Sequence, residues 1–498
     1  MAIPAEAFFL DPDFPGTLQM QIRNLVSEGI LAGRFRPGER MPSSRRLAAH
    51  LGLSRITVTL AYTDLVANGY LASRGRSGFF VAEDAPVPPS FTLPPRRGAR
   101  SVDWQRALAR RFAGPAAIQR PADWRRYPYP FIYGQADPRL FDHANWRLCA
   151  LQALGQRDFD ALTSDTYERD DPRLVEYILR HILPRRGIRA RPEEILLTMG
   201  AQNALWLAAA LLLNARRAAA IENPCYPALR DILATLRCRV EAVDVDARGL
   251  PPEALPPDLS AVFVTASHQC PTNATMPVER RRALIERAER DGFIIVEDDY
   301  EFEISPEAAP APALKSLDES GSVVHVGSFS KSLFPGLRLG FLVAAEPFID
   351  EARALRALML RHPPGHGQRT AAYFLSLGHY DAQVTRMADA YRRRRATMAE
   401  ALARHAVPGA GTARLGGSSA WLRAPEGVDI AELARRLAPR GVLVEPGAAF
   451  FHGAASPAFA RRHVRLAWSS IEPGRISSAT MAMPSGMRPG SIEDQARR

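Results

Sequence analysis

Between residues 125 and 472 the chain alternates short runs of apolar and β-branched residues with longer stretches of helical pattern. Four of these runs are EEILLTM, AVFVTAS, FIIVED and SVVHVGS. Alternation of this kind is typical of units in which parallel strands are joined by covering helices. It predicts an α/β domain with a mostly parallel central sheet, and no other feature of the sequence constrains the fold as strongly.

Residues 14–82 follow a different pattern, three helical segments and then two short strands, GYLASR and SGFFV. We expect the first helix to end near Gly33, the second to begin at an N-capping Ser44, and the third to begin at Ser54. Leu18, Ile22, Leu25 and Val26 mark one face of the first helix, and Ile56, Leu60 and Leu65 of the third are available for the core. This is the plan of a winged helix-turn-helix, whose third helix enters the major groove of DNA.

The same region is strongly basic, with nine arginines against three acidic residues between positions 20 and 80, a net charge of +6. Arg45, Arg46 and Arg55 fall at helix starts, where phosphates and base edges would be met, and Arg74 and Arg76 fall at the turn of the hairpin. The pattern favours binding of double-stranded DNA. The alternative is a three-helix protein-interaction domain with a solvated arginine face.

The flanking segments and the composition limit the remaining possibilities. Residues 83–124 are expected to form a linker rich in proline and arginine, and residues 473–498 a disordered tail. Four scattered cysteines without a CxxC pair argue against a disulfide scaffold or a structural zinc site. The longest apolar run has ten residues, and the first ten residues lack the basic start of a secretory signal. We therefore expect a cytoplasmic protein without a membrane span.

The chain has 62 arginines but only two lysines, Lys315 and Lys331. An arginine guanidinium cannot form a Schiff base with a carbonyl, so chemistry that depends on a lysine amine has two possible positions. Lys331 follows a predicted strand in SVVHVGSFSKSLFPGLRLG, with Ser328 and Ser330 before it and Arg338 after it. A lysine beside a phosphate-binding group at a strand end suits an aldehyde cofactor that carries a phosphate, pyridoxal 5′-phosphate. The alternative is a surface lysine in a basic loop.

A second predicted strand, in FIIVEDDYEFE, ends in Glu297, Asp298, Asp299 and Tyr300. Catalysis with this cofactor needs a carboxylate on the pyridine nitrogen, and a phenol near the ring hydroxyl assists it. Asp298 and Tyr300 would supply both. The alternative is a divalent-metal site in the acidic cluster, but further ligands at workable spacing are absent from the sequence, so we expect no metal.

Three further segments add candidate groups. The turn before a long apolar helix in TMGAQNALWL would present backbone N–H groups of Ala201 and Gln202 to a phosphate. Tyr226 follows a strand-to-turn signal, where an aromatic ring could stack on a cofactor, and Arg465 in VRLAWSS could bind a carboxylate bidentately. Taken singly, an ordinary buried helix start, a structural tyrosine and an ion-paired arginine explain the same residues.

The stretch RFRPGERMPSSRRLAAHLGLSRITVTLAYTDLVANGYLASRGRSGFFV resembles the GntR-type winged helix. The stretches YGQADPRLF, TASHQCPTN, EDDYEFE and GSFSKSLFPGLRLGF resemble fold type I aminotransferases, whose sheet domain is followed by a smaller C-terminal α/β part. Together, the chain is identified as a member of the MocR-type regulators. The resemblance implies an effector domain over residues 125–472 and a homodimer.

The resemblance also implies roles for single residues. Lys331 would carry the cofactor as a Schiff base, with Asp298 on the pyridine nitrogen, Tyr300 on the ring hydroxyl and Tyr226 stacked on the ring. Ala201, Gln202, Ser328 and Arg338 would hold the phosphate, and Arg465 the carboxylate of an effector. The residues expected to contact DNA are Arg45, Arg46, Ser54, Arg55, Thr57, Arg74 and Arg76, with Ile56 and Thr59 shaping sequence preference.

The sequence departs from the aminotransferase pattern at three positions. Cys270 stands where free aminotransferases have an asparagine that bonds the cofactor hydroxyl, Asn273 replaces a glycine, and Cys225 replaces the glycine before the stacking tyrosine. The lost hydrogen bond weakens the expectation of turnover more than that of cofactor binding. His268 is a candidate substitute.

Three functions are compatible with these features. The first is a DNA-binding transcriptional regulator that senses an amine or amino acid by aldimine exchange at Lys331. The second is an active aminotransferase that carries a DNA-binding domain. The third is a cofactor-free domain that serves only to dimerise the DNA-binding heads. The basic head and the missing asparagine favour the first, and γ-aminobutyrate, taurine, the cofactor itself and an ectoine-type amino acid remain open as its effector.

Overall fold

The computed structural model describes residues 2–86, 102–109, 112, 118, 120–132, 137–164, 168–304, 311–404, 414–415, 417–453 and 457–476. The chain divides into two compact units, Met1–Phe112 and Ala113–Arg498, each of which is described by itself. The second unit therefore begins before residue 125, where the linker was expected to end. The proline-rich residues 87–101 of the expected linker lie outside the described residues, and one helical turn, α4 (Trp104–Ala107), lies within it.

The first unit is a winged helix-turn-helix, as predicted. Its helices are α1 (Leu18–Leu31), α2 (Ser44–Leu51) and α3 (Arg55–Ala67). Strands β1 (Leu71–Ser73) and β2 (Phe79–Val81) pair antiparallel to form the wing. The core is made by residues from all these elements, among them Ile22, Val26, Leu47, Val58, Tyr62, Leu65 and Val81.

Three predictions for this unit need correction. The N-cap of α2 is Ser43, whose hydroxyl accepts the Arg46 N–H, rather than Ser44. Ile56 and Leu60 face solvent rather than the core, because the packed face of α3 carries Val58, Ala61, Tyr62 and Leu65. The unit also begins earlier than residue 14, since Ile3 and Phe8 are buried in its core.

The second unit is built on a seven-stranded sheet in the order β4-β10-β9-β8-β7-β5-β6. The strands pair in parallel from β9 to β6, and β10 is antiparallel to both of its neighbours. The strand bounds are β4 (Ile195–Thr198), β5 (Ala218–Asn223), β6 (Arg239–Asp244), β7 (Ala261–Val264), β8 (Ile294–Asp299), β9 (Val323–Ser328) and β10 (Gly340–Val343). All four apolar runs singled out in the sequence are strands of this sheet, and the fold-class prediction is confirmed.

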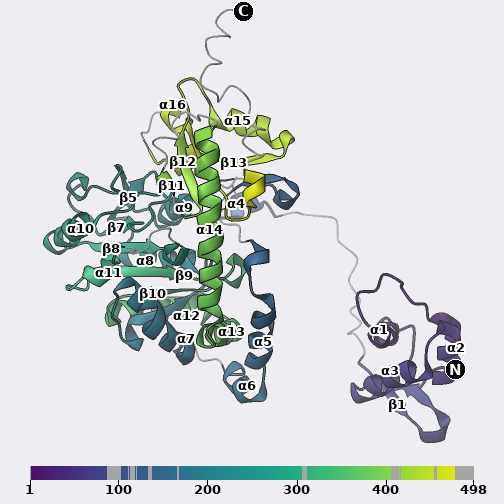
Figure 1. The fold of residues 1–498 in the computed structure, drawn as a ribbon. Helices are drawn as coiled ribbons and strands as arrows, with labels where there is room; N and C mark the ends of the chain where they lie inside the picture. The colour runs from purple at the N-terminus through teal and green to yellow at the C-terminus, as the bar shows by residue number, and fades with distance from the viewer. Residues whose placement is uncertain are drawn as a thin grey trace, which may run out of the picture. The chain divides into compact units, whose positions relative to one another are not determined.

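Helices cover the sheet and connect its strands (Figure 1). They are α5 (His143–Ala153), α6 (Gln156–Leu162), α7 (Pro172–Tyr177), α8 (Ala201–Leu212), α9 (Pro227–Leu236), α10 (Val278–Asp291), α11 (Leu314–Leu317), α12 (Glu346–Leu360) and α13 (Gly365–Ser376). The helix α8 is apolar on nearly every side and packs into the core against β8, β9 and β10. Its N-terminus therefore lies at a sheet edge rather than at the surface of the unit.

A smaller sheet in the order β11-β12-β14-β13-β3 forms the C-terminal part. Its strands are β3 (Tyr129–Phe131), β11 (Arg414–Leu415), β12 (Ser419–Arg423), β13 (Val442–Pro446) and β14 (His463–Ala467), with α15 (Ile430–Leu437) and α16 (Pro457–Ala460) beside them. The long helix α14 (His379–Arg404), green in Figure 1, joins the two parts: its Tyr380 is buried in the core of the larger part and its Leu402 in that of the smaller.

The expected tail begins later than predicted. Residues 473–476 are helical, and Ile476 is buried in the core of the smaller part beside Trp468 and Ile471. This single apolar side chain anchors a stretch whose composition predicted disorder. Residues 477–498 lie outside the described residues. Within the described part of the chain, no helix is long and apolar enough to cross a membrane.

Candidate functional site

A cavity of about 270 Å³ lies where β8 and β9 end beside the start of α8. All eight residues that the sequence predicts for the cofactor line it: Ala201, Gln202, Tyr226, Asp298, Tyr300, Ser328, Lys331 and Arg338. Arg120, Cys270, Ser330 and Pro335 complete the lining. Residues separated by more than a hundred positions in the sequence thus meet at one edge of the sheet, where open α/β sheets bind their ligands.

One end of the cavity gathers groups that attract an anion. Gly200 caps α8 with φ +79°, and a Cβ atom there would lie 3.1 Å from Nη2 of Arg338. The same Nη2 donates a 2.9 Å hydrogen bond to the Met199 carbonyl, which holds the guanidinium against the helix start. The N–H groups of the first turn of α8, the positive end of its dipole and this guanidinium favour a dianion, and the Ser328 and Ser330 hydroxyls stand beside them.

At the end of β8, strand alternation places Glu297 and Asp299 on one face of the sheet and Asp298 on the other. Glu297 accepts a 3.0 Å hydrogen bond from Nδ1 of His325, and Asp299 accepts one of 2.6 Å from Nε of Arg186, with both members of the Arg186 pair 1% exposed. These two carboxylates are neutralised by partners on the face away from the cavity. Among the described residues no group of three or more His, Cys, Asp or Glu side chains could hold a metal ion.

Asp298, between them, faces the cavity without such a partner. Its Oδ1 is buried and makes no hydrogen bond within the described part of the chain. Burial first, and then the negative charges of Asp299 and Glu222, raise the pKa of Asp298 to about 7. A buried carboxylate in this state is stabilised by a nearby N–H donor or cation. The pyridinium nitrogen of pyridoxal phosphate is such a group, and the residues present fit it.

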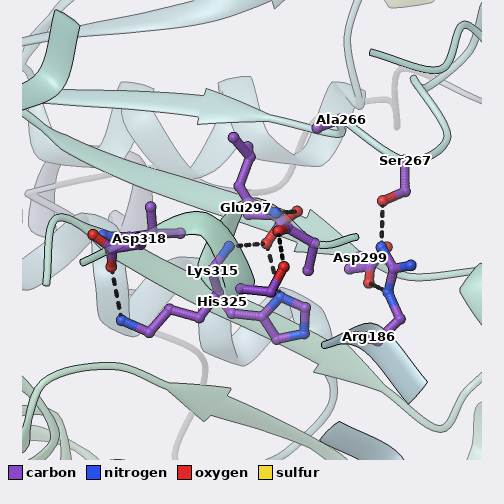
Figure 2. Close-up of polar contacts among 12 residues, drawn as sticks. Arg186, Ala266, Ser267, Glu297, Asp299, Lys315, Asp318 and His325 are labelled. Carbon is purple, nitrogen blue, oxygen red and sulfur yellow. Dashed lines mark hydrogen bonds and ion pairs between the residues drawn. The ribbon is translucent and has the colours of Figure 1, made fainter. Parts of the chain in front are cut away.

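The two lysines have opposite surroundings. The ammonium of Lys315 pairs with Oδ2 of Asp318 at 2.9 Å, away from the cavity (Figure 2). Burial lowers the pKa of Lys331 to about 8; the carboxylate of Glu301 opposes this shift, and the charges of Arg465 and Arg120 reinforce it. A larger neutral fraction is what a lysine needs to act as a nucleophile.

The groups around Lys331 include residues whose contacts the sequence did not predict. The Tyr300 hydroxyl donates a 3.0 Å hydrogen bond to the His268 carbonyl, and Nε2 of His268 lies 3.1 Å from Glu301. Burial opposes ionisation of Glu301, but the ion pair with His268 outweighs it and lowers the pKa of Glu301 to about 2. Burial also raises the pKa of the Cys270 thiol to about 11, so this group stays neutral at the cavity wall. The side chain of His268 therefore pairs with Glu301 and does not take the place of the missing asparagine.

Arg465 does not line the cavity but lies directly behind its wall. It is 2% exposed on β14, with Nη1 3.9 Å from Sγ of Cys270 and Nε 3.4 Å from the Ser419 hydroxyl. Its guanidinium carbon lies 5.7 Å from the ring centre of Phe450.

Sequence reasoning missed two residues of this site. Glu222, at the end of β5, is buried; its Oε2 accepts hydrogen bonds from Thr265 and Gln269, whereas its Oε1 has no partner among the described residues. Burial raises the pKa of Glu222 to about 7. A carboxylate at a strand end in IENPCYP was a signal that could have identified it. Arg120 lies in the expected linker and carried no local signal.

The predicted DNA-contacting residues lie on the first unit around α2, α3 and the wing. The Ser54 hydroxyl accepts the Thr57 N–H at 3.1 Å and thus caps α3, as predicted. Arg45, Arg55 and Ile56 are exposed, Ile56 to 72%, so the start of α3 presents cationic and aliphatic groups together. Such a surface suits phosphates and thymine methyl groups.

Two of the other predicted contacts are engaged within the unit. Arg46 pairs with Glu6 at 3.3 Å and Arg74 with Glu83 at 3.2 Å, both at exposed positions. Exposed pairs contribute about 0–1 kcal/mol, so a phosphate can replace the carboxylate. Arg76 lies in the turn of the wing, and its side chain is outside the described part.

Comparisons with known proteins match both units. Residues 18–81 match the family of bacterial regulatory proteins of the gntR type, and residues 159–467 match aminotransferases of class I and II. The HTH-type transcriptional regulator TauR of Rhodobacter capsulatus is 60% identical over 489 residues, which is 98% of this chain and all of that protein. The probable rhizopine catabolism regulatory protein MocR of Rhizobium meliloti is 30% identical over 401 residues, 80% of this chain and 79% of that protein.

Solved structures share the fold of the second unit. A kynurenine aminotransferase of Pyrococcus horikoshii, determined with PMP, has a TM-score of 0.66 and 23% identity over 76% of this chain and 96% of its own. The α-aminoadipate aminotransferase LysN of Thermus thermophilus has a TM-score of 0.66 and 24% identity over 79% of this chain and 100% of its own.

Proposed function

Because this chain belongs to the MocR-type transcriptional regulators, with a GntR-type winged helix before an aminotransferase-like domain, we propose that it binds pyridoxal 5′-phosphate at Lys331 and senses an amine or amino acid there. The observation that carries the proposal is the convergence of Lys331, Asp298 and the start of α8 on one cavity. An amine, a carboxylate for a ring nitrogen and an anion site are the three groups that this cofactor requires.

The residues that would hold the cofactor follow from this geometry. Asp298 would hold the proton of the pyridine nitrogen, which its raised pKa and unpartnered oxygen support. The first turn of α8, Ser328 and Arg338 would bind the phosphate, with Tyr226 along the ring and Tyr300 near its hydroxyl. When bound, the cofactor supplies an aldehyde carbon that joins reversibly to primary amines.

The protein's own groups would then control which amine occupies that carbon. Burial keeps part of Lys331 neutral and therefore reactive. Glu301 lies near Lys331, and its carboxylate would stabilise the ammonium form of that amine whenever the amine is not joined to the cofactor. The site would thus have two states, one with Lys331 and one with a metabolite amine on the cofactor. A difference in free energy between these states can change the DNA affinity of the other unit.

An active aminotransferase is the second candidate, since it would use the same Lys331, Asp298 and Arg465. The buried neutral thiol of Cys270 is a poor substitute for an amide hydrogen-bond donor, which favours sensing over turnover. Transfer of an amino group to a keto acid at about 1–10³ per second, the range of ordinary enzymes, would support the enzyme instead.

A homodimer is also part of the proposal. The segment of α5 and its C-cap exposes Leu148, Leu151 and Leu154 to 62%, 55% and 50% at three-residue spacing. An exposed apolar stripe of this kind on a folded unit marks a surface for association. A dimer would also place two winged helices on paired half-sites of an operator.

The proposed function can be tested by measuring the visible absorbance and the DNA affinity of the same protein. The wild-type protein supplied with the cofactor should absorb in the visible range, and amines or amino acids should change both the spectrum and the affinity for DNA from upstream of its own gene. Lys331→Ala should lose both responses, whereas Lys315→Ala should keep them. Retention of a ligand-dependent change in DNA affinity by Lys331→Ala would refute the sensing site.

A further inference from the structure

A second cavity, of about 10 Å³, adjoins the candidate cofactor site. Tyr226 and Asp298 line both cavities, and Glu222 lines the smaller one. A volume of this size is about what one buried water needs, provided that polar groups are there to bind it. Asp298 therefore borders both cavities, and Glu222 is the other carboxyl among the residues that line the smaller one.

The two oxygens of the Glu222 carboxyl have different surroundings. Oε2 accepts three hydrogen bonds, from the Thr265 N–H at 3.1 Å, from the Thr265 hydroxyl at 2.5 Å and from Nε2 of Gln269 at 3.2 Å. Oε1 is buried and has no partner within the described residues. A protonated carboxyl fits these surroundings, with Oε2 as the carbonyl oxygen that accepts and Oε1 as the hydroxyl oxygen that donates.

The charges near the smaller cavity favour a proton on Glu222 over one on Asp298. Burial raises the pKa of Glu222 to about 7, and the groups that oppose this rise, Thr265 and Gln269, are neutral. Burial also raises the pKa of Asp298 to about 7, but there the positive charge of Lys331 opposes the rise. The negative charge of an ionised Glu222 would raise the pKa of Asp298 further, so a proton on Glu222 favours the carboxylate form of Asp298.

The other titratable groups that line the smaller cavity are neutral near pH 7. Burial raises the pKa of the Cys225 thiol to about 12 and also raises that of the Tyr226 phenol. The remaining lining residues are Thr265 and apolar side chains. Among the residues of this cavity, Glu222 and Asp298 are therefore the two that can exchange a proton near neutral pH.

We propose that Glu222 is a positioning residue for Asp298: it keeps a proton on Oε1 and, through one water in the smaller cavity, donates a hydrogen bond to the Asp298 carboxylate. The inference rests on the proposed function and deepens it, because it assigns the group that holds Asp298 ionised and oriented for the ring nitrogen of the cofactor. A hydrogen bond donated to a carboxylate stabilises the charged form. Glu222 thus acts on the cofactor site through Asp298.

The location of the proton is tested on the full chain without cofactor. A protonated carboxyl, a carboxylate and an amide absorb at different infrared frequencies, so the spectrum of the wild type at pH 7 is compared with that of Glu222→Gln. We expect the difference spectrum to contain the band of a protonated carboxyl that the variant lacks. The band of a carboxylate in its place would show that Glu222 is ionised and would overturn the inference.

The effect on Asp298 is tested by the apparent dissociation constant of pyridoxal phosphate, measured by visible absorbance over a range of pH. Glu222→Gln keeps a neutral side chain that accepts through one atom and donates through the other, so we expect the affinity and its pH midpoint to match the wild type. Glu222→Met removes the donor, so the affinity should fall about tenfold or more and the midpoint should move to higher pH. Glu303→Gln is the matched control and should behave as the wild type, because burial also raises the pKa of Glu303 to about 7 but Glu303 lies outside both cavity linings.

A midpoint that moves to lower pH in Glu222→Gln would mean that the variant has lost a negative charge, and it would overturn the inference. Equal affinities of Glu222→Gln and Glu222→Met would overturn it too, because the donor would then have no effect. Glu222→Met leaves the donors of Thr265 and Gln269 without an acceptor; if this variant does not fold, the comparison of Glu222→Gln with the wild type decides by itself. If the wild type does not bind pyridoxal phosphate, the proposed function fails, and the infrared comparison alone then decides whether Glu222 carries the proton.

Discussion

The two units use arginine in opposite ways. In the first unit Arg45 and Arg55 are exposed, and the ion pairs of Arg46 and Arg74 lie at the surface. In the second unit Arg186, Arg281, Arg356 and Arg465 are among the largest fully buried side chains. An exposed guanidinium can exchange one anion for another at little cost, whereas a buried one is committed to its partners because of the desolvation penalty. A high arginine content therefore indicates DNA binding only where the arginine side chains are exposed in the folded structure.

The largest expected effect concerns a buried pair. Arg186→Ala leaves Asp299 as an uncompensated buried charge, so we expect the free energy of unfolding of the second unit to fall by about 3–5 kcal/mol in urea titrations. Arg392→Ala removes a 69% exposed arginine that is paired with Asp389 on α14. This variant should change the free energy of unfolding by less than about 1 kcal/mol. Removal of both charges in Arg186→Met/Asp299→Leu should restore most of the loss. Equal effects of the Arg186 and Arg392 variants would remove the contrast between buried and exposed arginines.

A pH effect separates Asp298 from its neutralised neighbours. Its pKa in the folded, cofactor-free protein is about 7, above the ordinary value near 4, so its contribution to stability is present below pH 4 and is lost as pH rises through 7. When the pH rises from 5 to 8, the free energy of unfolding of the cofactor-free wild type should fall by about 1–3 kcal/mol more than that of Asp298→Asn. Thermal or urea unfolding at the two pH values measures this. Identical slopes for the two proteins would mean that Asp298 is ionised in the folded state, as an exposed aspartate is.

The exposed arginines should act on DNA rather than on stability. Arg55→Ala at the start of α3 should weaken binding to the operator by about 1–3 kcal/mol and leave the unfolding midpoint unchanged. A random-sequence duplex is the control, measured over a range of salt concentrations. An equal loss on both duplexes would show that Arg55 contacts only phosphate.

The smallest expected effect comes from releasing an exposed arginine. Glu6→Gln removes the partner of Arg46, which then becomes available to a DNA phosphate. Affinity for non-specific DNA at low salt should rise about twofold, and the unfolding midpoint should stay the same. A fall in DNA affinity would indicate that the ion pair orients Arg46 for contact.

Much of the fold and site followed from local patterns. The strands were visible because a sheet buried on both faces needs continuous apolar runs, and Lys331 was conspicuous because only two lysines exist. The buried face of α3 was not visible, since RITVTLAYTDLVANG carries apolar residues all around the helix and only packing against α1 and α2 chooses among them.

Arg120 could not be found from the sequence for a different reason. Its partner Glu445 is 325 positions away, so nothing near Arg120 in the chain marks it. The same limit applies to Ile3, Phe8 and Ile476, whose burial depends on distant surfaces and not on local composition.

The central claim is that Lys331 holds the cofactor and Lys315 does not. The most direct measurement is the mass of peptides from the full chain after loading with pyridoxal phosphate and reduction with borohydride. We expect the phosphopyridoxyl mass on the peptide that contains Lys331 and the unmodified mass on the peptide that contains Lys315. An unmodified Lys331 peptide, or a modification found on Lys315 instead, would contradict the account.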